Sequence, residues 1–191
     1  MPFLQLTGNS DIEDEQLDDV SIIFKYAFLN NRDNGDVLSG GMLLSLPTGQ
    51  AIEVSGQSDI NSWIFEPFVG FIYHFSNDFF MQGFSSLAVP TDARDVTLFF
   101  NSIGFGYHAY RATDRGDMLR QVIPSLEFHL NTPLNHRGLE SVPIGYQDSL
   151  DVTAGVHVYL NRAEIGLAVC VPTMGPKPYD FELAAGFQYH Y

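Results

Sequence analysis

The residues of this sequence that could do acid–base or metal chemistry are histidines and carboxylates that alternate with other residue types along extended segments. Five of the six histidines occur in such segments, and Glu127 and His129 are two residues apart. Residues two apart share a face of a β-strand, so this spacing is compatible with shared coordination of a metal ion or with catalysis. A site in which these side chains converge is the first hypothesis.

No known catalytic or metal-binding motif supports that hypothesis. The sequence has no H-E-x-x-H pattern, no cluster of cysteine with histidine and no nucleophile elbow. The candidate acids and bases are also predicted at opposite ends of their strands: Glu66, Asp151 and Asp180 at one end, His74, His108 and His190 at the other. We therefore predict no catalytic residues, no metal ligands and no cofactor, and a protein that is not an enzyme.

Amphipathic strands would position these residues. In residues 179–191 every second side chain is apolar, and aromatic residues stand at both ends of the apolar face. A bilayer favours that arrangement, because aromatic rings favour its two interfaces and its middle accepts only apolar groups. The same alternation recurs in residues 20–30, 63–75, 102–110, 121–131, 150–161 and 163–172, and less clearly in 37–46 and 79–89.

These nine segments predict an all-β fold, an antiparallel up-and-down transmembrane β-barrel of about 10 strands in a single domain, residues 1–191. Strands of about 9–11 residues are long enough to cross a bilayer at a barrel's tilt. Bacterial barrels close with an even number of strands. Either residues 2–6 form the tenth strand, or the chain is an N-terminally truncated 12-stranded barrel.

The alternation assigns a direction to each side chain. The aromatic residues predicted to face lipid are Phe24, Tyr26, Phe28, Trp63, Phe65, Phe71, Tyr73, Phe75, Phe105, Tyr107, Phe128, Tyr179, Phe181, Phe187, Tyr189 and Tyr191. The polar residues predicted to line the lumen are Lys25, Glu66, His74, His108, Glu127, His129, Asp151, His157, Glu164, Asp180, Glu182 and His190. The apolar faces carry no acidic residue. A soluble β-sandwich or lipocalin-like binding protein stays open as an alternative, because its strands alternate too.

Lengths of the connections favour a membrane topology. The shortest, 161–162 and 76–78, fall on one side, and the longest, 47–62 and 134–149, on the other. Outer-membrane barrels have short periplasmic turns and longer extracellular loops. Pro67 and Pro124 lie within predicted strands, where proline removes a ladder hydrogen bond, so we predict a β-bulge at each.

The composition restricts the classes of partner that the protein could bind. The net charge of −14 argues against nucleic acid. No apolar run approaches the length of a transmembrane helix.

The single Cys170 allows no internal disulfide, and the acidic residues 11–19 form a predicted external segment. No secretory signal begins the sequence, which suggests a processed form or a fragment. The expected partners are membrane lipid and lipopolysaccharide; the oligomeric state is not predicted.

Three segments resemble a known family: residues 30–49, 123–135, and 171–178 leading into the last strand. They are similar to bacterial outer-membrane barrels associated with transport in the phenol meta-degradation pathway. The terminal strand also resembles the signal read by the barrel-assembly machinery, with Tyr191 where Phe or Trp is commoner. The resemblance implies a bacterial outer-membrane location and transport. The predicted function is a narrow, porin-like channel or transporter for small solutes, and the alternative is a structural or surface-interaction barrel with a side-chain-filled lumen.

Overall fold

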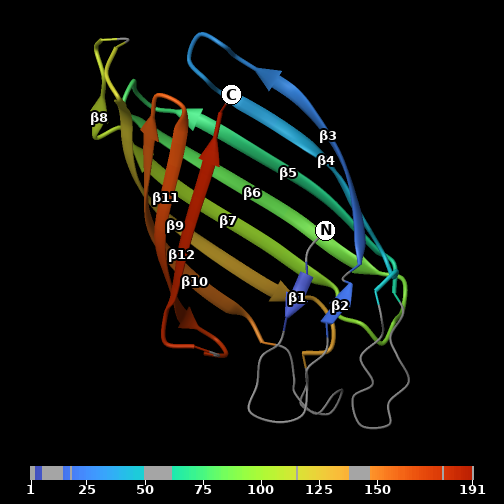
Figure 1. The fold of residues 1–191 in the computed structure, drawn as a ribbon. Helices are drawn as coiled ribbons and strands as arrows, with labels where there is room; N and C mark the ends of the chain where they lie inside the picture. Colours follow the sequence, from blue (N-terminus) through green and yellow to red (C-terminus); the bar gives the residue numbers. More distant parts are fainter. Residues whose placement is uncertain are drawn as a thin grey trace.

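The computed structural model describes residues 3–5, 15–17, 19–49, 62–114, 116–137, 147–177 and 179–190. In these residues every regular element is a β-strand (Figure 1). The strands are β1 (Phe3–Gln5), β2 (Glu15–Leu17), β3 (Val20–Asn30), β4 (Val37–Leu46), β5 (Ile64–His74), β6 (Phe79–Pro90), β7 (Leu98–Tyr107), β8 (Tyr110–Arg111), β9 (Leu119–Pro133), β10 (Ser149–Leu160), β11 (Ala163–Met174) and β12 (Glu182–Tyr189).

Nine long strands build one antiparallel up-and-down sheet. Their order across the sheet is β3, β4, β5, β6, β7, β9, β10, β11 and β12, and the short β8 pairs with the start of β9. These are the nine strands that the alternation predicts, so the antiparallel all-β prediction is confirmed. Strand β9 is longer than predicted and β12 is shorter, because residues 179–181 precede its ladder with β11.

The sheet is curved but open, and the prediction of a closed barrel is wrong for the part of the chain that the structure describes. Strands β3 and β12 form its two edges. Each antiparallel neighbour reverses direction, so β3 and β12 run the same way, and pairing them directly would require a parallel ladder. Residues 3–5 do form a strand, but β1 pairs with β2 in a separate sheet and supplies no tenth strand to the large one.

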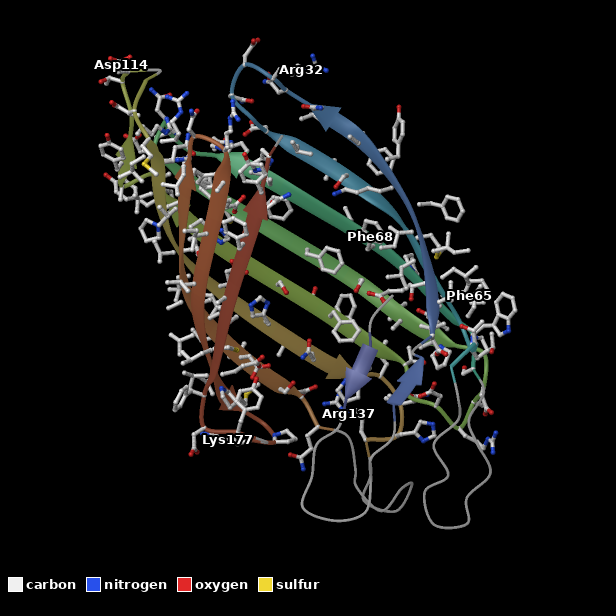
Figure 2. The ribbon with its side chains drawn as sticks, viewed as in Figure 1. Arg32, Phe65, Phe68, Asp114, Arg137 and Lys177 are labelled. Atoms are coloured by element: carbon white, nitrogen blue, oxygen red, sulfur yellow. The ribbon has the colours of Figure 1, made fainter. Side chains whose placement is uncertain are left out.

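The two faces of the sheet differ in exposure and in side-chain type. Along β5, Phe65, Pro67 and Val69 are exposed, whereas the intervening Glu66 and Phe68 are half-buried. Figure 2 shows Phe65 outside the curve of the sheet and Phe68 within it. The exposed, apolar side of β5 is therefore the convex face, and Glu66 belongs to the concave face.

The hydrophobic core is correspondingly thin. Among the described residues, the buried apolar side chains are Ala88 and Ile123, together with Pro133 at the end of β9 and Pro172 near the end of β11. Hydrogen-bonded ladders connect each strand to its neighbours, but few apolar side chains leave solvent. The large apolar side chains of the convex face thus remain exposed, and no described element of the chain covers them.

The predicted bulge is absent at Pro67, whereas the ladder opposite Pro124 is irregular. Pro67 pairs with Met42 in an unshifted register with β4, and on the other side the partners pass from Phe65–Val89 to Phe68–Ser86 without a shift. The register of Pro124 with β10 is also regular. On its other side Pro124 lies where the neighbour of β9 changes from β7 to β8. There residues 107–109 face only Ile123 and Pro124, so the register shifts by one residue and the extra residue belongs to the partner segment, not to β9. Both prolines occupy places where ladder pairs are omitted on one side, so their missing N–H groups leave no ladder hydrogen bond unmade there.

The connections follow the predicted alternation. The short ones after β3, β5 and β10 lie at one end of the sheet, and the described ends of the long ones after β4 and β9 lie at the other. The Asn-Gly signal after β3 forms a tight connection, in which Asn31 N–H donates to the Asp36 carbonyl at 2.9 Å and Gly35 has a φ of +82°. In the residues that can be described, no helix has the length and apolar character needed to cross a membrane.

Candidate functional site

The concave face brings predicted lumen residues together in three clusters. The first lies at the end of the sheet that holds the short connections. His74 Nδ1 lies 3.2 Å from Asp36 Oδ1, and the main-chain N–H of His74 donates to the same oxygen at 2.8 Å. The backbone hydrogen bond from His74 is the main reason why the pKa of Asp36 lies below its usual value. These contacts connect the turn between β3 and β4, which contains Asp36, to the end of β5.

His108 extends this first cluster. The ring of Phe80 lies 5.5 Å from the rings of both His74 and His108. Burial is the main cause that lowers the pKa of His108, and the positive charge of Arg111 adds to it. His108 Nδ1 is buried and has no hydrogen-bond partner among the described residues. A neutral imidazole is favoured there.

The second cluster joins β10 to β11. His157 Nδ1 lies 3.0 Å from Glu164 Oε1. Tyr159, the register partner of Glu164, stacks its ring near that of His157, with centroids 6.5 Å apart. The contact of His157 with Glu164 is a diagonal cross-strand pair, of a kind that stabilises sheets.

The third cluster contains the pair that the sequence singled out. Ser102 Oγ lies 2.9 Å from His129 Nδ1, and His129 Nε2 lies 3.7 Å from Glu127 Oε2. On the other side of the carboxylate, Gln82 Nε2 donates to Glu127 Oε1 at 3.4 Å. Three strands, β6, β7 and β9, therefore supply one polar network. It can accept and donate hydrogen bonds and can hold a positive charge.

A pocket of about 410 Å³ opens over the third cluster. Its polar lining includes Lys25, Ser39, Gln82, Ser102, Glu127 and His129, and Gly70 and Gly104 lie among them. A Cβ at Gly104 would lie 3.0 Å from Glu127 and 3.2 Å from Gln82. Glycine at this position therefore lets the two polar side chains approach each other.

The other predicted lumen residues do not converge. Glu66 lies on β5, Asp151 on β10 and Glu182 on β12, whereas Asp180 and His190 flank β12. Asp151 is the register partner of His129, but no hydrogen bond joins their side chains. In the part of the chain that the structure describes, no group of three or more His, Cys, Asp or Glu side chains could hold a metal ion.

Most predicted outward aromatic residues are exposed on the convex face. Tyr73, Phe75, Phe79 and Phe105 form a row with successive ring centroids 5.1, 5.6 and 6.2 Å apart. Tyr179 differs from the prediction: it precedes β12, and its hydroxyl lies 3.9 Å from Cys170 Sγ. Residue Tyr191 lies outside the described residues, as do most of the acidic segment and the middles of the two longest connections.

Sequence reasoning missed two features. Gln82 lies in the strand with blurred alternation, and only its register with Gly104, the partner of Glu127, reveals its place. The convex face also contains a polar pair, Ser85 Oγ and Asn101 Oδ1, 2.6 Å apart, beside a hollow lined mainly by apolar side chains. Neither residue breaks the apolar pattern clearly enough to be noticed from one strand alone.

Comparison of the chain with protein-family models, with curated proteins and with solved structures finds no match. The function must therefore be inferred from the two faces of the sheet and from the pocket.

Proposed function

We propose that this protein is a bacterial outer-membrane β-barrel that forms a narrow channel or transporter for small solutes. The observation that carries the proposal is the segregation of side chains between the two faces of nine consecutive strands. On the convex side, Tyr26 is 69% exposed, Leu167 55% and Phe187 71%. Soluble proteins rarely leave contiguous apolar surface of this kind uncovered.

Lipid is the environment that suits this convex face. The nine long strands have between 8 and 15 residues, and most meet the length of about 9–11 residues required to cross a bilayer with tilt. The aromatic row of Tyr73, Phe75, Phe79 and Phe105 lies near one end of the strands, where amphipathic rings favour the bilayer interface. Arg111 and Arg120 flank the connection at the same end, from which long side chains reach headgroups.

Closure is part of the proposal, because unpaired edges in lipid leave backbone groups without partners. One further strand, antiparallel to both β3 and β12, would pair the two edges and give an even number of long strands. The C-terminal strand β12 is the segment that the barrel-assembly machinery would read.

The concave face suits the passage of small solutes. It offers a pocket of about 410 Å³ with polar side chains, and the chain carries a net charge of −14. Carboxylates such as Glu127, Asp151 and Glu164 would favour cations and neutral polar molecules over anions.

A soluble β-protein is the second candidate, favoured by the open sheet. In that case a second apolar layer would cover the convex face. A structural barrel, in which the concave side chains fill the lumen, is the third.

Gel mobility with and without boiling distinguishes these candidates. We expect the detergent-folded protein to migrate differently after boiling, as a closed barrel does, and to conduct ions in a planar bilayer. A mobility shift without conductance would support the structural barrel. A protein that folds without detergent and shows no shift would refute the membrane proposal.

A further inference from the structure

The pocket on the concave face is a trough that runs across the strands. One row of register partners forms its floor, passing from His129 to Ser102, Phe84, Gly70 and Ser39. Two serines and a glycine keep most of this floor low. The trough therefore extends from β9 to β4, and Lys25 on β3 lines it as well.

The two ends of the trough carry opposite charges. At the β3 end, the exposed Lys25 makes no hydrogen bond or ion pair with any described residue. At the β9 end stand Glu127 and His129, whose side chains are 26% and 31% exposed. A lysine ammonium is a compact charge on a flexible stem, so it can follow an anionic group over several ångströms.

Glu127 is held in place but retains acceptor capacity. Its contacts with Gln82 and His129 are 3.4 and 3.7 Å long, at or beyond the limit of a good hydrogen bond. An ionised carboxylate has about four lone-pair sites. A ligand ammonium could therefore approach Glu127 without displacing a strong bond.

An aromatic surface lies between the two charged ends. Phe84 stacks on Phe68 with ring centroids 5.8 Å apart, and Phe84 is 41% exposed. An apolar ligand body that packs against Phe84 would be removed from contact with water, and this burial favours binding. The trough thus presents a cation, an apolar surface and an anion in that order.

We propose that the trough binds small zwitterions whose ammonium and carboxylate groups stand at opposite ends of a short apolar body, the ω-amino acids. The ammonium would lie at Glu127 and the carboxylate at Lys25. This inference rests on the proposed function, since it names the solute class of the concave face.

Three matched probes test the proposal: 6-aminohexanoate, hexylamine and hexanoate, titrated calorimetrically into the detergent-folded full chain at low ionic strength. We expect 6-aminohexanoate to bind at least tenfold more tightly than either singly charged probe, because only it gains both charge-assisted contacts. Equal affinities for the three probes would overturn the proposal.

Two substitutions should affect the probes in a crossed manner. Lys25→Gln should weaken 6-aminohexanoate and hexanoate about tenfold and leave hexylamine unchanged. Glu127→Gln should weaken 6-aminohexanoate and hexylamine and leave hexanoate unchanged. Glu182→Gln and Lys177→Gln, which change the same charges away from the trough, serve as controls and should leave all three affinities unaltered. A response to the control substitutions as large as to Lys25→Gln would mean that the overall charge, not the trough, governs binding.

The failure of this inference is distinguishable from failure of the proposed function. A chain that shows the boiling-dependent mobility shift and conducts, but binds no probe, would refute the ω-amino acid site alone. A chain that binds 6-aminohexanoate with the crossed pattern but neither shifts nor conducts would retain the site and refute the channel.

Discussion

The convex and concave faces of the sheet come from the same strands, yet they follow different rules. On the convex face large apolar side chains stay exposed, and neighbouring rings contact one another. On the concave face polar side chains pair across strands, as His157 does with Glu164 and Ser102 with His129. Each strand therefore meets two different environments at alternate residues. The same substitution should therefore have consequences of different size when it is moved by one position along the chain.

The largest contrast should come from placing a charge on each face of β10. Val156 has Leu167 and Pro124 as register partners, whereas Thr153 has Glu127 and Cys170. In a bilayer, Val156→Arg should cost about 2–4 kcal/mol of unfolding free energy. Thr153→Arg should be much milder, because its guanidinium would lie near Glu127. Urea titration of refolding into phospholipid vesicles measures both, and equal penalties would show that the two faces are wrongly assigned.

The next contrast concerns side-chain size on the concave face. A Cβ at Gly41 would collide with the carbonyl oxygen of Phe24 in the neighbouring strand, whereas a Cβ at Gly186 would have no atom within 4 Å. Gly41→Ala should therefore destabilise the pairing of β3 with β4 by about 1–3 kcal/mol, as overpacking does. The matched Gly186→Ala should be close to neutral in the same urea titration. A stable Gly41→Ala variant would show that β3 shifts easily.

A smaller effect is expected from the polar pair on the convex face. Replacing both partners, Ser85→Ala with Asn101→Leu, should increase stability in vesicles by about 1 kcal/mol, because neither variant side chain then needs a hydrogen bond in lipid. Asn101→Leu alone should gain less, since it leaves the Ser85 hydroxyl without its present partner. A loss of stability in the double variant, measured by the same titration, would indicate that this pair faces water or a polar partner.

The smallest effect should lie outside both faces, in the connection after β6. Arg94 lowers the pKa of Asp92 from 3.8 to about 2, chiefly by hydrogen bonding to its carboxylate. Since the folded-state pKa is the lower one, the stabilisation is complete above pH 3.8 and disappears as the pH falls through about 2. An NMR titration of the Asp92 carboxyl should therefore give a midpoint near 2, and Arg94→Gln should raise it. An unchanged midpoint in Arg94→Gln would contradict this assignment.

The sequence predicts the strands well because a period of two residues is a local property. All nine segments are strands, and the assigned face of Phe65 agrees with its exposure. Pairings between distant residues are not local: the contact of Gln82 with Glu127 depends on the register of three strands. Closure is likewise a property of the whole sheet. Tyr179 was misplaced because it precedes β12, where the alternation no longer fixes a direction.

Because β3 and β12 run in the same direction, only certain numbers of additional strands could close the sheet into an antiparallel ring. An antiparallel ring can be completed only by an odd number of additional strands, because nine long strands leave both edges with the same polarity. A second copy of the sheet in the same membrane orientation cannot meet this rule. Its β12 would lie parallel to β3 at each of two seams, and parallel pairs are the less stable kind. If the sheet closes as proposed, an odd number of extended strands would complete it, and a second copy of the sheet in the same orientation would not.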